Sequence, residues 1–248
     1  MIAILSPAKS LNYDRRYDLP EVTQPRLATQ TALLVDRAKQ MSVEDIMAKM
    51  DISRALGELN FDRWQGFDTQ PEAAALQVFD GDVYDGLKAG ELTTEDFAFA
   101  QNHLRILSGL YGMLRPLDLM RPYRLEMGTK RFPNDHKLSI WWETAIAEIL
   151  TQDMDDNGDR TILNLASQEY YAAIKGRLPK DVRVVDVEFM TGDRFITFHA
   201  KLARGVMARW MIDNKITNIE DMKGFDYAGY VFDADESTEN SWTFRRPA

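Results

Sequence analysis

The segment from Leu107 to Thr129 combines helix-breaking residues with large apolar side chains. The helix breakers are Gly109, Gly112, Pro116, Pro122 and Gly128. They prevent a long helix, whereas the leucines, methionines and tyrosines between them favour burial. We therefore expect a long ordered loop, pinned by its apolar residues, that holds arginines in a fixed geometry. Ordered loops of this length are usually functional.

The cations of this region are Arg115, Arg121, Arg124, Lys130 and Arg131, and its only acids are Asp118 and Glu126. Arginine suits the bidentate binding of phosphate or carboxylate, so the surplus of positive charge indicates a site for a polyanion. The alternative is a set of structural arginines bonded to the two acids and to backbone carbonyls. The formal net charge of the chain is -9, which argues against a general nucleic-acid coat but not against a local basic patch.

The pattern along the chain predicts one α/β domain over residues 1–248, with a mixed sheet and a helical insertion at about 25–150. Met1–Ser6 and Arg160–Ala166 are apolar on both faces and predict buried strands. No apolar run approaches the roughly 20 residues of a membrane span, and the start lacks the features of a signal peptide. The absence of cysteine excludes disulfides and thiolate sites. We expect a cytoplasmic protein.

Further helices are expected at 25–40, 71–78, 94–107, 139–150 and 201–214, and late strands at 227–233 and 241–246. A hairpin is expected from 182–190 and 194–200 around Thr191-Gly192-Asp193.

Two short predicted helices resemble a helix-hairpin-helix element. Ser42 begins the first, which ends near Met50, and Ser53 begins the second, which ends near Leu59. Such hairpins hold DNA phosphates on backbone N–H groups at a helix start. Arg54 would attract a phosphate, although the hairpin contains no glycine. An ordinary pair of packed helices is the alternative.

Polar residues follow both predicted buried strands. If these strands are parallel neighbours, Lys9 meets Asn164, Ser167, Glu169 and Tyr170 beyond their carboxyl ends, where α/β proteins bind ligands. Lys9 and Glu169 are the catalytic candidates: Lys9 as a phosphate ligand or a nucleophile, Glu169 as its partner or a proton carrier. The alternative is a helix-capping serine, a first-turn acid and a solvated lysine.

Six blocks of sequence resemble the peroxide stress resistance protein YaaA family. They are Ser-Pro-Ala-Lys-Ser-Leu at 6–11, Phe-Asp-Gly-Asp-Val-Tyr at 79–84, Leu-Ser-Gly-Leu-Tyr-Gly at 107–112, Arg-Pro-Leu-Asp at 115–118, Arg-Pro-Tyr-Arg-Leu-Glu-Met-Gly-Thr at 121–129 and Asn-Leu-Ala-Ser-Gln-Glu-Tyr at 164–170. The resemblance implies a cytosolic bacterial protein that protects against hydrogen peroxide and lowers free iron. It also implies an α/β fold with a helix-hairpin-helix element, a positively charged cleft and DNA binding.

No cofactor and no metal ion are expected. Asp153–Gly158 matches the first half of a calcium loop, but Asn164 stands where the bidentate glutamate is required, so a solvated acidic turn is the better interpretation.

Two functions remain open from the sequence. The first is a DNA-binding stress protein that contacts phosphates with little sequence preference, through Lys9, Arg54, Arg115, Arg121, Arg124, Lys130, Arg131, Asn164, Ser167 and Tyr170. The second is an enzyme acting on a small anionic substrate, such as a nucleobase or nucleotide, with Lys9 in the pocket. A long open groove would favour the first, and a closed pocket would favour the second.

Overall fold

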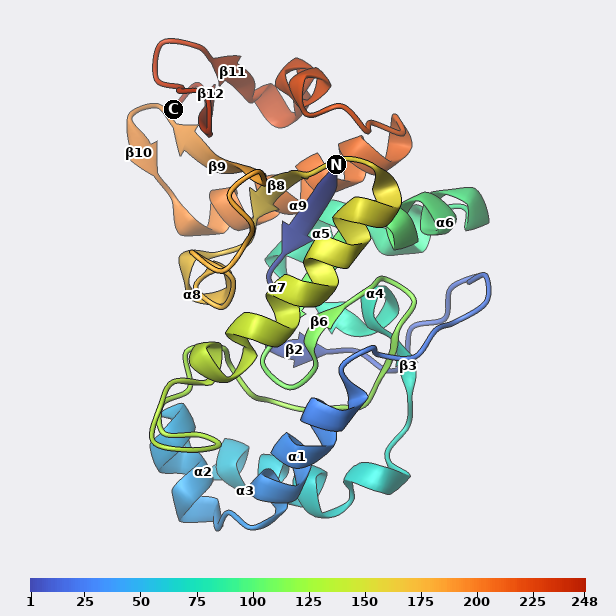
Figure 1. The fold of residues 1–248 in the computed structure, drawn as a ribbon, viewed down its shortest axis with the longest axis vertical. Helices are drawn as coiled ribbons and strands as arrows, with labels where there is room; N and C mark the ends of the chain where they lie inside the picture. The colour runs from blue at the N-terminus through green and yellow to red at the C-terminus, as the bar shows by residue number, and fades with distance from the viewer.

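The fold is built around an eight-stranded β-sheet, shown in a computed structural model that describes residues 1–248 (Figure 1). Its strands are β1 (Ile2–Leu5), β5 (Leu104–Ser108), β6 (Gly112–Leu114), β8 (Thr161–Leu165), β9 (Arg183–Thr191), β10 (Arg194–Phe195), β11 (Val231–Asp233) and β12 (Ser241–Arg246). The order is β11-β12-β9-β8-β1-β5-β6, with β10 paired to β9. Neighbours from β12 to β5 are parallel, whereas β6, β10 and β11 are antiparallel.

The two strands predicted from apolar sequence lie in the middle of this sheet. All four residues of β1 are buried, as are the last four of β8. A strand that is apolar on both faces needs cover on both faces, which only a central position supplies. β1 and β8 are adjacent and parallel, with Ile4 opposite Asn164 and Leu5 opposite Leu165. The prediction of two buried strands is confirmed.

Helices cover both faces of the sheet. They are α1 (Ala28–Lys39), α2 (Val43–Met50), α3 (Arg54–Gln65), α4 (Ala75–Val78), α5 (Asp82–Leu87), α6 (Thr94–His103), α7 (Leu138–Asn157), α8 (Gln168–Tyr171) and α9 (Thr197–Asp213), with 3₁₀ turns at Phe67–Thr69, Ala89–Glu91, Ile219–Gly224 and Tyr227–Gly229. In Figure 1, α7 crosses in front of β1, and α5 and α9 lie behind it. α9 packs on β9 and α6. None of the helices combines the length and hydropathy that a membrane span requires.

Helices α1, α2 and α3 form a lobe below the sheet in Figure 1, here called the helical lobe. Its buried side chains, including Leu34, Ile46 and Trp64, belong to the same continuous hydrophobic cluster as Ile2 and Leu5 of β1. The lobe is therefore joined to the sheet by a shared core.

The segment from 107 to 129 differs from the predicted loop. Its apolar residues are buried as expected, but it begins within β5 and contains β6 and a short strand, β7 (Leu119–Met120). β7 pairs with β3 (Ala73–Ala74), and a second small pair joins β2 (Ser10–Leu11) to β4 (Phe79–Asp80). Because β5 and β6 join the central sheet, the stretch predicted as a helical insertion at 25–150 is not purely helical.

Two helix predictions and one turn prediction are also corrected. The stretch 71–78 forms β3 and the single turn α4, and the helix from Thr94 ends at His103 because the chain becomes β5. Asp153–Asn157 is the last turn of α7, not an acidic loop, and Asp153 is buried there.

The late part of the chain follows the predictions more closely. β12 matches its predicted range, whereas β11 is shorter than predicted. The predicted hairpin is present as β9 and β10, but β10 has only two residues and α9 begins at Thr197.

The hairpin helices α2 and α3 are present and pack closely. A Cβ atom built on Gly57 of α3 would lie 2.7 Å from the Cγ atom of Met47. Ser42 and Asp45 form the predicted capping box of α2, and Asp51 ends that helix in a left-handed conformation with φ 52°. The DNA-binding identity of this helix pair is not confirmed and stays a prediction.

Candidate functional site

The carboxyl ends of β1 and β8 form the switch point of the parallel sheet. β5, the next parallel strand along the chain after β1, pairs with one side of β1. β8 pairs with the other side of β1, and β9 follows β8 in that direction. Open α/β sheets bind ligands in the crevice at such a point. Ser6 and Ser167 bridge it: the Ser167 amide donates to Ser6 Oγ at 2.8 Å, and the two hydroxyl oxygens lie 3.2 Å apart.

A cavity of about 480 Å³ lies at this point and is here called the switch-point cavity. One wall is the loop Ser6–Ser10, and another is the stretch from Leu165 to Tyr170 after β8. The remaining walls come from the turn into α5, at Asp80–Tyr84, and from Lys201 and Arg204 of α9. The strand ends and two helices thus enclose a polar pocket.

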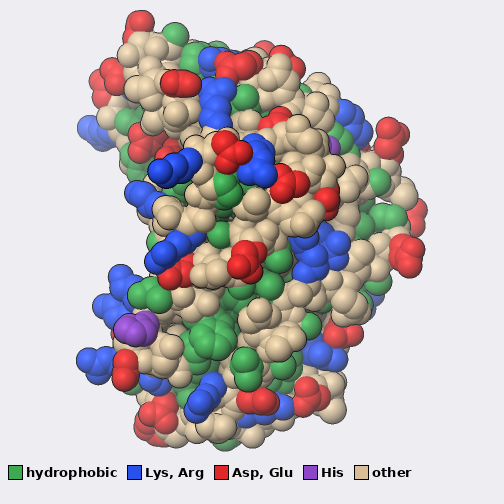
Figure 2. All heavy atoms as spheres, in the orientation of Figure 1, with side chains coloured by type: hydrophobic (Ala, Val, Ile, Leu, Met, Phe, Trp, Pro, Cys, Tyr) green, Lys and Arg blue, Asp and Glu red, His purple; other side chains and the backbone are tan.

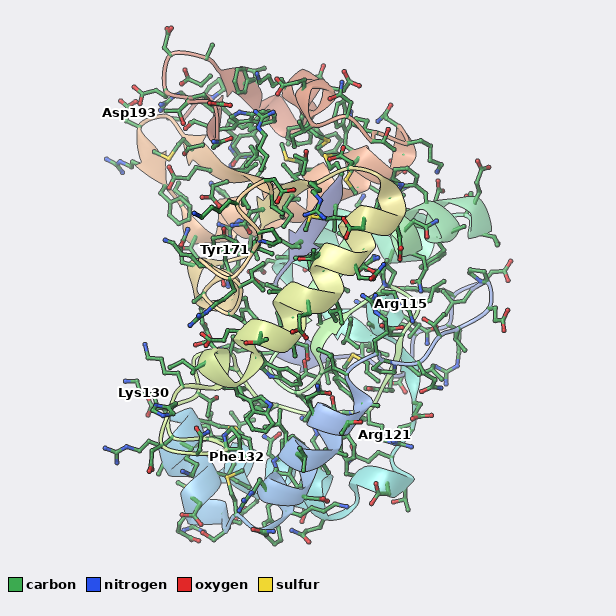
Figure 3. All side chains as sticks on the ribbon, viewed as in Figure 1. Arg115, Arg121, Lys130, Phe132, Tyr171 and Asp193 are labelled. Atoms are coloured by element: carbon green, nitrogen blue, oxygen red, sulfur yellow. The ribbon has the colours of Figure 1, made fainter.

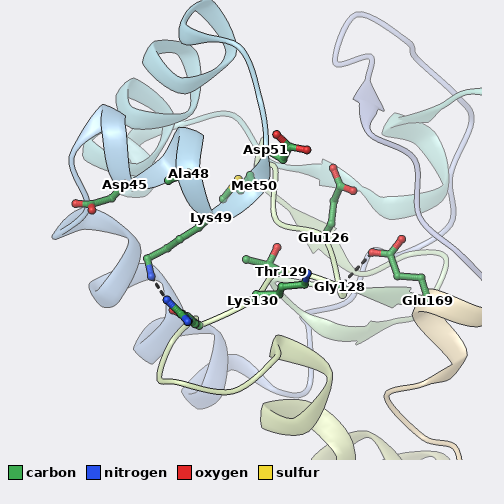
Figure 4. A pocket seen from close by; sticks show the side chains of 11 residues that line it. Asp45, Ala48, Lys49, Met50, Asp51, Glu126, Gly128, Thr129, Lys130 and Glu169 are labelled. Atoms are coloured by element: carbon green, nitrogen blue, oxygen red, sulfur yellow. Dashed lines mark hydrogen bonds between the residues drawn. The ribbon is translucent and has the colours of Figure 1, made fainter.

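A second cavity of about 630 Å³, the interlobe cleft, separates α2 from the segment Glu126–Arg131 (Figure 4). Lys49 donates a 2.7 Å hydrogen bond across it to the carbonyl oxygen of Arg131. Glu169 accepts from the Gly128 amide at 2.9 Å and lines both cavities. The two cavities are therefore neighbours that share one carboxylate.

Lys9 is paired with Glu126, not with Glu169. Its ammonium lies 2.9 Å from Glu126 Oε2, and Arg124 approaches the other oxygen at 3.3 Å. The Lys9 side chain is 62% exposed. A nucleophilic lysine is usually activated by desolvation, so this geometry favours an electrostatic role for Lys9.

The predicted arginines are mostly neutralised by acids. Arg115 forms an ion pair with Asp118 at 2.8 Å, and Arg121 with Glu72 at 3.0 Å while stacking on the ring of Phe67. Exposed Arg54 pairs with Glu44 and Glu58 on the helical lobe. The expected surplus of positive charge counted only the acids nearby in the sequence. It therefore left out partners such as Glu72, which is distant in sequence from Arg121.

Lys130 and Arg131 differ from these arginines, because both are exposed and neither forms an ion pair. The exposed Lys137 and Lys175 also have no acidic partner. Figure 2 shows Lys and Arg side chains on both sides of the hollowed left edge of the molecule, where Figure 3 labels Lys130. Two exposed cations without an acid partner, Lys130 and Arg131, thus line the interlobe cleft.

The polar side chains at the end of β8 and just after it mainly hold the loop in place. Asn164 is buried, donates to Asp186 at 2.6 Å and accepts from the Ala166 amide at 3.0 Å. Burial raises the pKa of Tyr170 well above its usual value, as it does for Tyr84, whose hydroxyl donates to the Ser6 carbonyl at 3.0 Å. Both phenols stay protonated, and that of Tyr84 acts as a hydrogen-bond donor.

The comparison with known proteins agrees with the resemblance of the sequence motifs. The profile described as "Peroxide stress protein YaaA" matches residues 1–236. The chain belongs to the peroxide stress protein YaaA family. It is 43% identical over 249 residues to a "UPF0246 protein" of Rhizorhabdus wittichii, with 98% of each chain covered. It is also 43% identical over 254 residues to a "UPF0246 protein" of Saccharophagus degradans, with 99% of each covered.

Two cations of this YaaA-family chain were missed from the sequence. Lys201 and Arg204 are three residues apart on α9, a spacing that places both on one helix face. That spacing was the available signal, but the helix was interpreted only through its apolar stripe. No cluster of three or more His, Asp or Glu side chains has the arrangement of a metal site.

Proposed function

We propose that this chain binds DNA through phosphate contacts along the interlobe cleft, with little sequence preference, as its part in peroxide resistance. The observation that carries the proposal is the pair of exposed cations without acid partners that line the cleft, Lys130 and Arg131. Such cations gain free energy by replacing the counterions of DNA phosphates.

The segment that carries these cations is held in place. Thr129 accepts a 2.9 Å hydrogen bond from the Leu138 amide, and Phe132 donates to the His136 carbonyl at 3.3 Å. Cations on an ordered segment lose less side-chain and backbone entropy on binding than cations on a mobile one. Covering phosphates would also displace iron ions bound to DNA, which is how this binding would limit iron-dependent damage.

Fluorescence anisotropy with duplex, mismatched and single-stranded DNA tests the proposal. Binding through three to five phosphates gives a slope of log K against log salt concentration of roughly -3 to -5. Lys130→Ala and Arg131→Ala should each make this slope shallower by about 1. Arg37→Ala is the matched control, since Arg37 is exposed, has no acid partner and lies on α1 outside the cleft.

Absence of binding to all three DNA forms at low salt would refute the proposal. Equal slopes for Arg131→Ala and wild type would place the DNA elsewhere.

A further inference from the structure

Arg204 presents a guanidinium group without a partner to the switch-point cavity. Its Nε atom is buried and has no hydrogen bond, and no carboxylate forms an ion pair with it. Burial lowers the pKa of Arg204, and the charge of Glu188 offsets this only in part. A buried charged donor without an acceptor is costly, so such a group in a cavity indicates an absent anion.

The position of Arg204 is fixed by close contact between α9 and α5. A Cβ atom on Gly205 would lie 1.7 Å from the carbonyl oxygen of Val83, and one on Gly86 would lie 2.2 Å from that of Leu202. Both helices supply walls of the cavity, so their contact holds the arginine relative to the rest of the pocket. A donor held in place before binding favours affinity.

A second cation and several hydroxyl groups share the cavity with Arg204. Lys201 lies one turn earlier on α9, is half exposed, and is 3.8 Å from Asp82. The hydroxyls of Ser6, Ser10 and Ser167 lie in the strand-end walls. The cavity therefore offers donors for an anion and hydrogen-bonding groups for a polar body.

None of the acids that line the cavity forms an ion pair with Arg204. Asp80 forms an ion pair with Arg15 at 2.5 Å, Asp82 faces Lys201, and Glu169 accepts from the Gly128 amide. Carboxylates of this kind are suited to accept hydrogen bonds from ligand hydroxyls, as the acid of a dinucleotide fold does from a ribose.

We propose that the switch-point cavity is a binding site for a small phosphate monoester with a hydroxylated body, whose phosphate pairs with Arg204 and Lys201. The volume of about 480 Å³ lies within the usual range for small-molecule sites. The cations of this site differ from those of the interlobe cleft, and the proposal does not depend on DNA binding. An arginine fork matches phosphate oxygens bidentately, which accounts for the unfilled donors.

Isothermal titration calorimetry of the full chain tests the site with three probes: inorganic phosphate, thymidine 5′-monophosphate and thymidine. We expect the monophosphate to bind more tightly than phosphate, and thymidine to bind much more weakly than either. Arg204→Met should weaken binding of the monophosphate roughly 10- to 100-fold, the ratio that loss of a charged hydrogen bond gives. Arg204→Lys keeps the positive charge but loses the forked guanidinium group. Its affinity for the monophosphate should therefore fall between those of wild type and Arg204→Met.

Matched controls separate this site from the cleft. Lys130→Ala should leave monophosphate binding unchanged, and Arg204→Met should leave the salt slope of DNA binding unchanged. If Arg204→Met does not fold, as judged by circular dichroism, the Arg204→Lys variant decides the question. Equal monophosphate affinity in the folded Arg204 variant and wild type, or binding of DNA in place of all three probes, would overturn the proposal. Tighter binding of free phosphate than of the monophosphate would restrict the ligand to the inorganic anion. That result would also contradict the proposal.

Discussion

Gly86 and Gly205 bring the backbones of α5 and α9 into direct contact. Neither position has room for a Cβ atom, since the opposing carbonyl oxygens would be 2.2 Å and 1.7 Å away. α5 carries Tyr84, and α9 carries Arg204, on two walls of the switch-point cavity. The geometry of the pocket thus depends on two residues that contribute no side chain to it.

We expect Gly205→Ala to lower the free energy of unfolding by about 3 kcal/mol, because the methyl group forces the helices apart. Urea denaturation measures the change. Gly224→Ala is the control: its Cβ would be 3.7 Å from a ring carbon of Trp210, an ordinary contact, so little change is expected. Equal stability of Gly205→Ala and wild type would show that α5 and α9 separate easily.

Asp153 links three segments through a buried ion pair. Its two oxygens each accept from Arg26 at 2.6 Å, and Arg105 Nε donates at 2.6 Å. Asp153→Ala leaves buried positive charge unpaired, so the unfolding free energy should fall by about 3–5 kcal/mol. Asp156→Ala, an exposed acid on the same turn, should change it by less than about 0.5 kcal/mol. Similar losses from both variants would contradict a structural role specific to Asp153.

Asp96 gives a pH dependence of stability. Burial raises the pKa of its carboxyl, but hydrogen bonds from Lys215 and Thr93 outweigh this and lower the pKa from 3.8 to about 2. A depressed folded-state pKa contributes stability above pH 3.8 that is lost as the pH falls through about 2. The stability difference between wild type and Asp96→Asn should therefore shrink between about pH 5 and pH 2. A difference that stays constant over this range would show that Asp96 is not the titrating group.

Lys9→Ala should abolish protection against peroxide in cells that lack the native protein, at normal abundance of the variant. Its ion pair with Glu126 is exposed, so the unfolding free energy should change by less than about 1 kcal/mol. Because Lys9 is not desolvated, borohydride should trap no covalent adduct with DNA or a sugar phosphate. Lys180→Ala, another exposed lysine, is the control. Full protection by Lys9→Ala would remove Lys9 from the site.

The central strands could be predicted because their sequence pattern has one physical explanation. Met1–Ser6 and Arg160–Ala166 are apolar on both faces, and only the middle of a covered sheet accommodates such segments. Their carboxyl ends then had to meet if the strands paired, which placed Lys9 and Ser167 near one another. β5 was missed because it follows α6 without any turn residue, and a short apolar run fits either a helix or a strand.

The charges of the site were harder to predict than its position. The Arg115–Asp118 pair is three residues apart and visible in the sequence, but Glu72 reaches Arg121 only after folding. Arg204 was missed for the opposite reason: nothing in a helix sequence shows that an arginine will be left without an acid. An ion pair between residues close in sequence can be predicted from their spacing. A charged side chain without a partner can be identified only once the complete fold is known.

The core that runs unbroken from β1 into the helical lobe has a kinetic consequence. A lobe attached by Leu34, Ile46 and Trp64 to the same buried cluster as the sheet cannot swing independently. The interlobe cleft is then open before any partner arrives, and no slow closing step separates encounter from the final complex. Stopped-flow association should follow one exponential whose rate rises linearly with DNA concentration.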